Sequence, residues 1–555
     1  MTPAPHIPLS PPPPGKKSPL ERKNRVYHII YTYDVLDRVT SMTSPVGTTK
    51  YHYDDSTGRL DEIETPQGKK FRYSYDHGQL AALEYPNGIV ANYDFDDNGN
   101  LTDLHYQKGD GSTLQRFQYD YDKNRMRTAM TDNDGLHNYF YDSIYQVIGA
   151  THPTPPRPLE QFQYDAVGNL LGGGRVHNGL NQLVEDDSCW YLYDLDGNMT
   201  SKVSKTTGDS TKFTWDIENR LIRAEKPGTV AECMYDALGR RMRKTVNGGV
   251  HEYRYDRENL IFEMNDAGET VGSYAFGPGI DNPIMITSGA KSYCYVRDGL
   301  GSVTALTDTI GDLVKEYAYS SFGAVVKEAG IGILNPFAYT SREWDEDVGL
   351  YYYRARYYDA QIGRFLNQDP IGFKAGDINV YRYVWNSPLN AVDPSGLSAY
   401  DPGCMAACVG DAVLNFGVGF IPGANAIEFV LELSGVDVNL FQGLLGYDTP
   451  LDVSSTGAAA AVGSALKLYA NTSYEAAGGE GGYNRQNDLV NRDGFNGKPT
   501  KQQEKMLSRL GNLSNLRKLV SVFGTISNLL NFFDFLADLS SCEGKCEIEE
   551  CPKKK

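Results

Sequence analysis

The chain has 555 residues, enough for several domains and a large hydrophobic core. Its 53 basic and 71 acidic residues leave a formal net charge of −18. This balance argues against a broad nucleic-acid-binding face, because such a face needs clustered Lys and Arg. Tyr and Gly are abundant, at 39 and 57 residues, a pairing that favours β-strands joined by tight turns.

The N-terminal segment, residues 1–24, is rich in proline and is predicted to be disordered and solvated. No apolar segment follows the first Met, so no signal peptide is expected, and no window of about 20 apolar residues predicts a transmembrane helix. We therefore expect synthesis in the cytoplasm, with secretion or injection by a specialised system or release by lysis.

Residues 25–290 carry a recurring unit of the form Tyr-x-Tyr-Asp-x-x-Gly-Arg/Asn-Leu, seen clearly in Tyr51–Leu60. Its Asp residues are mostly 20 to 23 positions apart, which indicates a repeat architecture. Each unit predicts a β-hairpin, because Tyr-x-Tyr places two aromatic rings on one strand face and Asp and Gly favour the turn. Lone hairpins are marginally stable, so we expect them to pair into one long, coiled sheet. The marking residues are Asp34, Asp54, Asp76, Asp96, Asp122, Asp142, Asp165, Asp194, Asp216, Asp236 and Asp256.

Two functions are compatible with such a sheet. The first is a shell that encloses a passenger. The second is a non-enzymatic surface or adhesion protein that contacts carbohydrate or cells, because tyrosine-lined surfaces stack on sugars.

After the repeats, residues 349–397 are dense in Tyr and Arg and contain two Asp-Pro-x-Gly units, Asp369–Gly372 and Asp393–Gly396. A single unit of this kind is an ordinary β-turn, with Asp at the first position, Pro at the second and Gly at the fourth. Two copies beside the runs RARYYD and GRFLNQDPIGF are far more specific. The turn residues besides Asp are Pro370, Gly372, Pro394 and Gly396.

These runs, together with Tyr295–Asp308, Tyr317–Gly323 and Asn335–Arg342, closely resemble the core domain of the Rhs/YD-repeat toxins, which include the C subunits of insecticidal toxin complexes. The resemblance covers residues 25–397, with the repeat-associated core at 291–397. It implies a mainly β fold, in which the YD-repeat hairpin sheet coils into a shell that the core domain caps.

The resemblance also implies that the core cuts its own chain between Leu397 and Ser398. In that case Asp369 and Asp393 are an aspartic-protease-like pair, and Arg356 is their basic partner. Close carboxylates share one proton, so the ionised member takes a proton from water while the other donates to the scissile carbonyl. The cleavage is single-turnover and gains from enforced proximity. Three further arginines of the segment are alternative partners: Arg354, Arg364 and Arg382.

Residues 398–555 lie beyond the resemblance and are predicted to be a mainly α effector domain. The clearest helix begins at Thr500, where Gln503 completes a capping box, and continues with apolar residues at spacings of three and four. The effector is either an ordinary globular domain or a membrane-inserting, pore-forming toxin. All nine histidines lie at or before His251, which excludes histidine-dependent nucleases, proteases and deaminases from this segment.

The cysteines divide between the two parts of the chain. Those of the repeats, Cys189, Cys233 and Cys294, are interpreted as small core residues. Those beyond residue 397 are compatible with disulfides or free thiols, whereas their spacing without His fits a zinc site poorly. They are Cys404, Cys408, Cys542, Cys546 and Cys551.

The sequence therefore predicts a polymorphic toxin that acts on competing bacteria or on host cells. No cofactor and no metal are expected. The expected partners are a cognate immunity protein and a delivery apparatus such as a type VI secretion system, with a target membrane as a further candidate. The protein's own C-terminal domain is the expected encapsulated passenger, and no nucleic acid is expected to bind the shell.

Overall fold

A computed structural model describes residues 27–153 and 157–397. Within these residues the chain forms strands and three short 3-10 helices, and no α-helix. The mainly β fold predicted from the repeats is thus confirmed for this part of the chain. No helix among the described residues is long and apolar enough to span a membrane. The proline-rich segment 1–24, the predicted helical segment 398–555 and the five cysteines within it lie outside the described residues.

The strands form three antiparallel sheets in which every strand pairs with its neighbours in sequence. The 13-stranded sheet contains β1 Ile30–Tyr33, β2 Val39–Ser44, β3 Gly47–Tyr53, β4 Leu60–Glu64, β5 Lys70–Asp76, β6 Gln79–Glu84, β7 Val90–Phe95, β8 Leu101–Gln107, β9 Thr113–Tyr121, β10 Arg127–Asp132, β11 Gly135–Tyr141, β12 Val147–Thr151 and β13 Glu160–Gln161.

The 16-stranded sheet contains β14 Val176–His177, β15 Leu183–Glu185, β16 Cys189–Tyr193, β17 Met199–Ser204, β18 Ser210–Trp215, β19 Leu221–Lys226, β20 Thr229–Tyr235, β21 Arg241–Val246, β22 Gly249–Asp256, β23 Asn259–Asn265, β24 Thr270–Phe276, β25 Pro283–Ser288, β26 Lys291–Arg297, β27 Val303–Thr307, β28 Leu313–Tyr319 and β29 Val325–Gly330. The core sheet contains β30 Glu343–Asp345, β31 Leu350–Tyr353, β32 Arg356–Asp359 and β33 Arg364–Phe365. The 3-10 helices are η1 Tyr339–Ser341, η2 Gly372–Ala375 and η3 Val384–Asn386.

In most repeats the Asp builds the turn that follows it. In the turn after β20, Asp236 Oδ1 accepts the backbone N–H groups of Leu238 (2.9 Å) and Arg240 (3.0 Å), while Oδ2 accepts from Arg240 Nε at 2.9 Å. Gly239 lies between them in the left-handed region, with φ +76°. The spacing Asp-x-x-Gly-Arg is therefore explained, because Gly supplies the positive φ and the fifth residue closes on the Asp carboxylate.

In several repeats the Tyr before the Asp links its hairpin to the preceding one. The hydroxyl of Tyr235 donates to the carbonyl of Leu221 at 2.7 Å, and the guanidinium of Arg220 lies 5.1 Å from the centre of the same ring. Tyr53, Tyr121, Tyr141, Tyr164 and Tyr319 make the same backward hydrogen bond. The stacked tyrosines expected from the sequence are therefore also hydrogen-bonded links between repeats.

The sheet curves because a β-bulge recurs in nearly every hairpin. The pairing register shifts just before the second aromatic residue, for example between His52 and Tyr53 and between Met234 and Tyr235. A bulge bends its strand and increases the local twist. The bulge was not predicted from the sequence.

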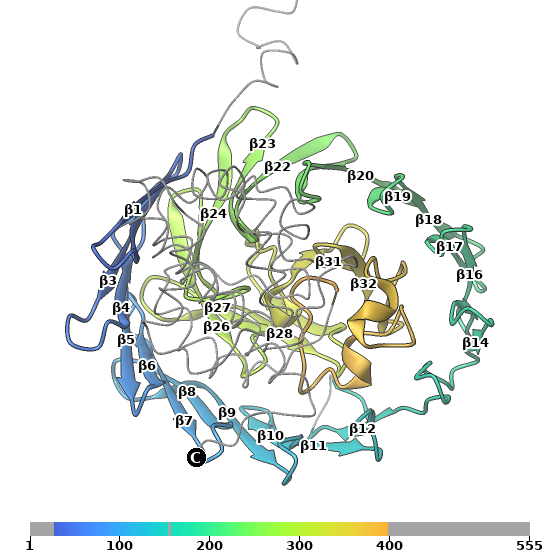
Figure 1. Cartoon of the computed structure of the whole chain (residues 1–555), viewed down its shortest axis with the longest axis horizontal. Coiled ribbons are helices and arrows are strands. Elements are labelled where there is room, and N and C mark those ends of the chain that lie inside the picture. Colours follow the sequence, from blue (N-terminus) through green and yellow to red (C-terminus); the bar gives the residue numbers. More distant parts are fainter. Residues whose placement is uncertain (1–26, 154–156, 398–555) are drawn as a thin grey trace, which may run out of the picture.

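The two large sheets follow one another around a ring (Figure 1). The ring closes where β1 meets β23: the ring of Tyr27 lies edge-on to Phe262, with centroids 5.8 Å apart, and the Tyr31 hydroxyl donates to Asp256. The later strands β24 to β28 lie inside this ring, where Met285 and Val296 share a buried cluster with Phe71 of β5.

The core sheet also lies within the ring (Figure 1). Its residues Leu350, Tyr352 and Leu366 pack against Leu183 and Met199 of the 16-stranded sheet. The shell thus coils around its own later strands. The core sheet packs against the early strands of the 16-stranded sheet on one side and against its later strands on the other.

The turn geometry predicts different roles for two adjacent acidic residues. Asp96 Oδ1 accepts N–H groups of Asn98 (2.9 Å) and Asn100 (2.8 Å), whereas its neighbour Asp97 is exposed. Replacing Asp96 with Ala should lower stability by about 1–2 kcal/mol, because two backbone donors and the Asn100 amide lose their acceptor. The control Asp97→Ala should stay within about 0.5 kcal/mol of the wild type. Melting followed by near-ultraviolet circular dichroism measures both, and equal melting temperatures for the two variants would contradict the role of Asp96.

Candidate active site

The core sheet places its charged residues against a wall of buried aromatic rings. Tyr351, Tyr353 and Tyr358 are each 0% exposed and pack with Phe365 and Tyr383. These large apolar surfaces fix β31, β32 and β33, and they leave little water around any charge at the sheet. The polar residues of this region are therefore buried groups that need partners.

Arg356, the first residue of β32, brings the two predicted aspartates together. Its Nη2 lies 3.1 Å from Asp369 Oδ2 and 3.2 Å from Asp393 Oδ2. All three residues are at most 7% exposed. The guanidinium carbon lies 3.6 Å from the centre of the Phe365 ring. The arginine and two carboxylates singled out from the sequence thus form one buried cluster.

Three donors on residues 354–356 hydrogen-bond to three successive backbone carbonyls of the second Asp-Pro-x-Gly turn. Arg354 Nη1 donates to the Pro394 carbonyl, the Ala355 N–H donates to the Ser395 carbonyl at 3.2 Å, and Arg356 Nε donates to the Gly396 carbonyl. The turn is closed from the other side by Asp393. Its Oδ1 accepts the N–H groups of Gly396 at 2.8 Å and Leu397 at 3.1 Å.

The two aspartates have different environments. Burial raises the pKa of Asp369 to about 6, although the nearby Arg356 charge opposes this shift. Its Oδ1 accepts one backbone N–H, from Ile371 at 3.0 Å. Asp393 Oδ1 accepts two N–H groups and the Ser395 hydroxyl, contacts that are best satisfied by an ionised carboxylate. The arrangement favours Asp369 as the proton donor and Asp393 as the base.

A cavity of about 20 Å³ lies at the cluster and is lined by Arg356, Asp369, Asp393 and Leu397. This is room for about one water molecule, and the carboxylates supply polar partners for it. Leu397, the residue before the predicted cleavage point, is described and borders this cavity. Ser398, on the other side of that bond, lies outside the described residues.

Backbone strain accompanies the cavity. Val384, Trp385 and Asn386 are consecutive residues with φ of 40°, 52° and 60°. Such left-handed conformations cost about 1–3 kcal/mol each for residues other than glycine, and they gather at functional sites. Side-chain hydrogen bonds hold the segment: Asn386 Nδ2 donates to Gln146 Oε1 and to the Gly168 carbonyl, both at 2.8 Å.

The alternative arginines occupy other positions. Arg382 pairs with Asp377 at 2.7 Å, and Arg364 donates to the backbone carbonyl of Asn181. Arg354 donates to the Pro394 carbonyl but pairs with Asp281, at 2.7 Å, rather than with either aspartate of the cluster. Only Arg356, among the arginines weighed from the sequence, contacts Asp369 and Asp393 in the described structure.

Sequence reasoning missed the groups that come from far away in the chain. Asp281, Gln146 and the Val380 carbonyl, which accepts from Arg356 Nη1 at 3.2 Å, carry no motif that would mark them. Tyr353 was also missed, although the Tyr-rich run around it was a usable signal. The Tyr353 carbonyl oxygen would lie only 2.2 Å from a Cβ atom added to Gly396, so that position has no room for a side chain.

Two features lie outside this cluster. Within the described residues, one group with metal-ligand spacing occurs, formed by His52, Glu62 and Glu64. Glu64 pairs with Lys50 at 3.0 Å and Glu62 pairs with Lys70 at 2.7 Å, so lysines already balance the negative charge that would attract a metal ion. The described cysteines are free thiols, with Cys233 and Cys294 buried and Cys189 half-buried.

Comparisons with known proteins agree on the shell. The Teneurin YD-shell family model matches residues 15–116 and 112–389. The chain is 30% identical over 388 residues to the tRNA3(Ser)-specific nuclease WapA of Bacillus spizizenii, covering 66% of this chain and 15% of that protein. It is 28% identical over 331 residues to double-stranded DNA deaminase toxin A of Burkholderia cenocepacia, covering 52% of this chain and 23% of that protein.

The solved structure of the Tc holotoxin pore from Photorhabdus luminescens has the same fold in its matching part. It superposes with a TM-score of 0.55 at 19% sequence identity, covering 67% of this chain and 21% of that chain. The described chain thus spans between 15% and 23% of the length of these three proteins.

The two glycines of the Asp-Pro-x-Gly turns should respond differently to an added methyl group. Gly396 has φ +76° and no room for a Cβ, whereas Gly372 has φ +59° and open space around it. We expect Gly396→Ala to displace the turn and expose the N–H groups of residues 396 and 397 to hydrogen exchange. Gly372→Ala should cost about 1 kcal/mol and leave that protection intact. Mass-resolved amide exchange measures both, and unchanged protection in Gly396→Ala would contradict the described turn.

Proposed function

The chain belongs to the Teneurin YD-shell family, and from that premise we propose that it is a polymorphic toxin of the Rhs type whose core cuts its own chain after Leu397. The cut separates the shell from a C-terminal effector, residues 398–555. The observation that carries the proposal is the buried Asp369–Arg356–Asp393 cluster, with Leu397 on the same cavity.

The chemistry follows from the two carboxylates. Asp393, held ionised by the donors of its own turn, accepts a proton from a water molecule in the cavity. The water oxygen attacks the carbonyl carbon of Leu397, and Asp369 donates its proton to the carbonyl oxygen. Collapse of the intermediate breaks the bond to the nitrogen of Ser398, which takes up the proton that Asp393 had accepted and leaves as an amine. The proton on the former carbonyl oxygen returns to Asp369. The products are a Leu397 carboxylate and a Ser398 amine.

Arg356 has two roles in this reaction. Its charge stabilises the negative charge that stays on the dyad, and its Nε holds the Gly396 carbonyl next to the scissile bond. Because the substrate is part of the same chain, no binding step is needed and the reacting groups are already in place. The protein performs this reaction once.

The relatives support the toxin role. Two proteins that share this shell are named as a tRNA nuclease and a double-stranded DNA deaminase toxin. Such activities would damage the cell that makes them, so a separable effector, a cognate immunity protein and a delivery apparatus are part of the proposal. The target of residues 398–555 and their mode of action, as an enzyme or by membrane insertion, are open within it.

The proposal predicts that single amide substitutions stop the cleavage. Asp369→Asn and Asp393→Asn should each leave one intact chain of 555 residues, because neither can complete the proton transfers. The control is Asp377→Asn, which removes a third carboxylate from the same cavity that is paired with Arg382. Intact-mass spectrometry of the purified variants distinguishes these outcomes. Cleavage in both dyad variants would refute the dyad, and loss of cleavage in the control as well would point to a general disturbance of the cavity.

The rate of cleavage should depend on pH through Asp369. The reactive form needs this residue protonated, and its pKa is raised to about 6. The rate should therefore fall as pH rises through this value, by about tenfold for each further pH unit. Cell-free synthesis followed by a chase in buffers from about pH 5 to about pH 8 measures the rate on newly made chains. A rate that is constant or rises across this range would contradict Asp369 as the acid.

A further inference from the structure

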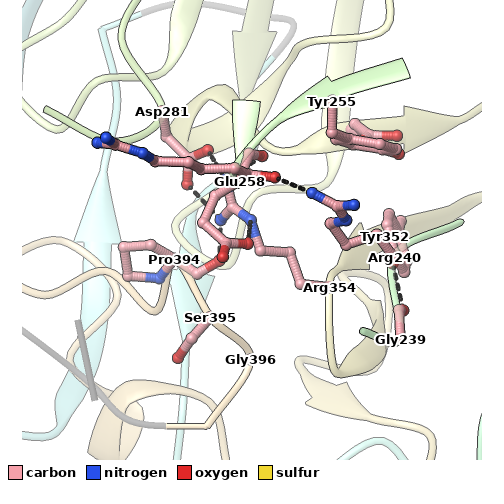
Figure 2. A network of polar contacts seen from close by, with 12 residues as sticks. Gly239, Arg240, Tyr255, Glu258, Asp281, Tyr352, Arg354, Pro394, Ser395 and Gly396 are labelled. Atoms are coloured by element: carbon pink, nitrogen blue, oxygen red, sulfur yellow. Dashed lines mark hydrogen bonds and ion pairs between the residues drawn. The ribbon is translucent and has the colours of Figure 1, made fainter. Parts of the chain in front are cut away.

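Arg354 contacts the cleavage turn from outside the aspartate cluster. It is the first residue after β31, and its Nη1 donates to the Pro394 carbonyl, one residue after Asp393 (Figure 2). Together with the Ala355 N–H and Arg356 Nε, it completes the row of donors that hold the carbonyls of residues 394, 395 and 396. Displacing this contact would free the turn on the side nearest to Asp393.

The other nitrogens of Arg354 are anchored to the 16-stranded sheet. Asp281, in the loop between β24 and β25, accepts from Nη2 at 2.7 Å and from Nη1 at 3.1 Å. Glu258, in the turn between β22 and β23, accepts from Nη2 through its backbone carbonyl at 3.1 Å, and its carboxylate lies 3.5 Å from Nε. Figure 2 shows Arg354 between these two acidic residues and the Pro394–Gly396 segment.

A second observation indicates that this side chain is needed. Arg354 has φ +55°, and it stands at the first position of the two-residue turn that joins β31 to β32. Glycine and asparagine are the residues preferred at such a position, because a Cβ is strained there. An arginine kept in a left-handed conformation, with its side chain only 13% exposed, is a feature that local turn chemistry does not explain.

We propose that Arg354 is a positioning residue of the self-cleavage reaction: it fixes the Asp393–Leu397 turn through a hydrogen bond to the Pro394 carbonyl. Asp281 and Glu258 anchor the Arg354 guanidinium to strands β22–β25 of the shell. The inference rests on the proposed cleavage after Leu397. Arg354 does not touch Asp369, and it takes no proton from the reaction. It acts by keeping the scissile bond at the dyad.

One consequence is that the geometry of cleavage depends on the shell strands. Asp281 and Glu258 lie 116 and 139 residues before Leu397, and they reach the turn only when β22–β25 have folded beside the core. The neighbouring turn after β20 joins the same network, since Arg240 Nη1 donates to the Arg257 carbonyl at 3.0 Å (Figure 2). Cleavage is therefore fastest in chains whose shell is complete around the core.

A matched control for Arg354 is available in Arg342. Both arginines bind Asp281, and Arg342 Nη1 does so at 2.6 Å. The remaining contacts of the Arg342 guanidinium are the Tyr352 carbonyl, at 2.8 Å from Nη2, and the Tyr353 ring, whose centre is 5.7 Å away, rather than the Pro394 carbonyl. Removing either guanidinium takes one cation from Asp281. Only removal of Arg354 also releases Pro394.

The experiment compares wild type, Asp369→Asn, Arg354→Gln and Arg342→Gln as full chains in the cell-free chase, with the melting temperature of each purified protein. We expect Arg354→Gln to slow cleavage by about 10- to 100-fold, because a small displacement of reacting groups has effects of this size. Its dependence on pH should match that of the wild type, since the dyad is unchanged. Arg342→Gln, which also removes a buried cation from Asp281, should lower the melting temperature about as much as Arg354→Gln. It should nevertheless cleave within about threefold of wild type.

Two further variants keep the inference testable if Arg354→Gln folds poorly. Asp281→Asn removes the anchor without touching residues 393–397 and should slow cleavage in the same direction. Arg354→Lys keeps a positive charge beside Asp281 and should recover part of the rate.

The outcomes separate the two proposals. Arg354→Gln at the wild-type rate, or slowed equally with Arg342→Gln in step with melting temperature, overturns the positioning role alone. A wild type that stays whole refutes the proposed cleavage and this inference with it.

Discussion

The organisation of the core depends on the burial of one positive charge, the Arg356 guanidinium. Removing such a group from water costs several kcal/mol, and burial lowers the pKa of Arg356 against the raising effect of Asp369 and Asp393. The free-energy cost of burying this charge is offset only where both carboxylates and the carbonyls of Val380 and Gly396 contact the guanidinium. Breaking one such contact in a buried cluster costs about 3–5 kcal/mol. The cluster is thus stable only in the arrangement that also brings Leu397 to the dyad.

The repeats provide the frame in which this arrangement is possible. Most repeat Asp residues close their own turn, several of the Tyr hydroxyls just before them bond to the previous hairpin, and the bulges add curvature, so local rules generate a ring. The later strands turn inside that ring and meet the core sheet. Shell and core consequently share contacts, such as the pair formed by Asp281 and Arg354, and the Asp393–Gly396 turn is positioned by both.

The sequence predicted the local features well because their causes are local. The Asp-x-x-Gly spacing specifies a turn within five residues, and Tyr-x-Tyr specifies a strand face, so the hairpin sheet followed from the pattern. Asp369, Asp393 and Arg356 were marked by a resemblance in their motifs, and the structure brings them into contact. Asp281 and the left-handed φ of Arg354 could not be predicted, because they depend on a contact between residues 73 positions apart. The bulges were missed, although buried residues three positions apart, such as Leu60 and Ile63, depart from the alternation of a regular strand.

In the proposed reaction, a water molecule activated by Asp393 and Asp369 cuts the bond after Leu397. Synthesis of the wild-type chain in water enriched in heavy oxygen, followed by mass spectrometry of the shell fragment and the released fragment, tests this step. Two fragments that meet at Leu397 and Ser398 are expected, with one heavy oxygen in the new Leu397 carboxylate. A single intact chain, a cut at any other bond, or a Leu397 terminus without the heavy oxygen would contradict it.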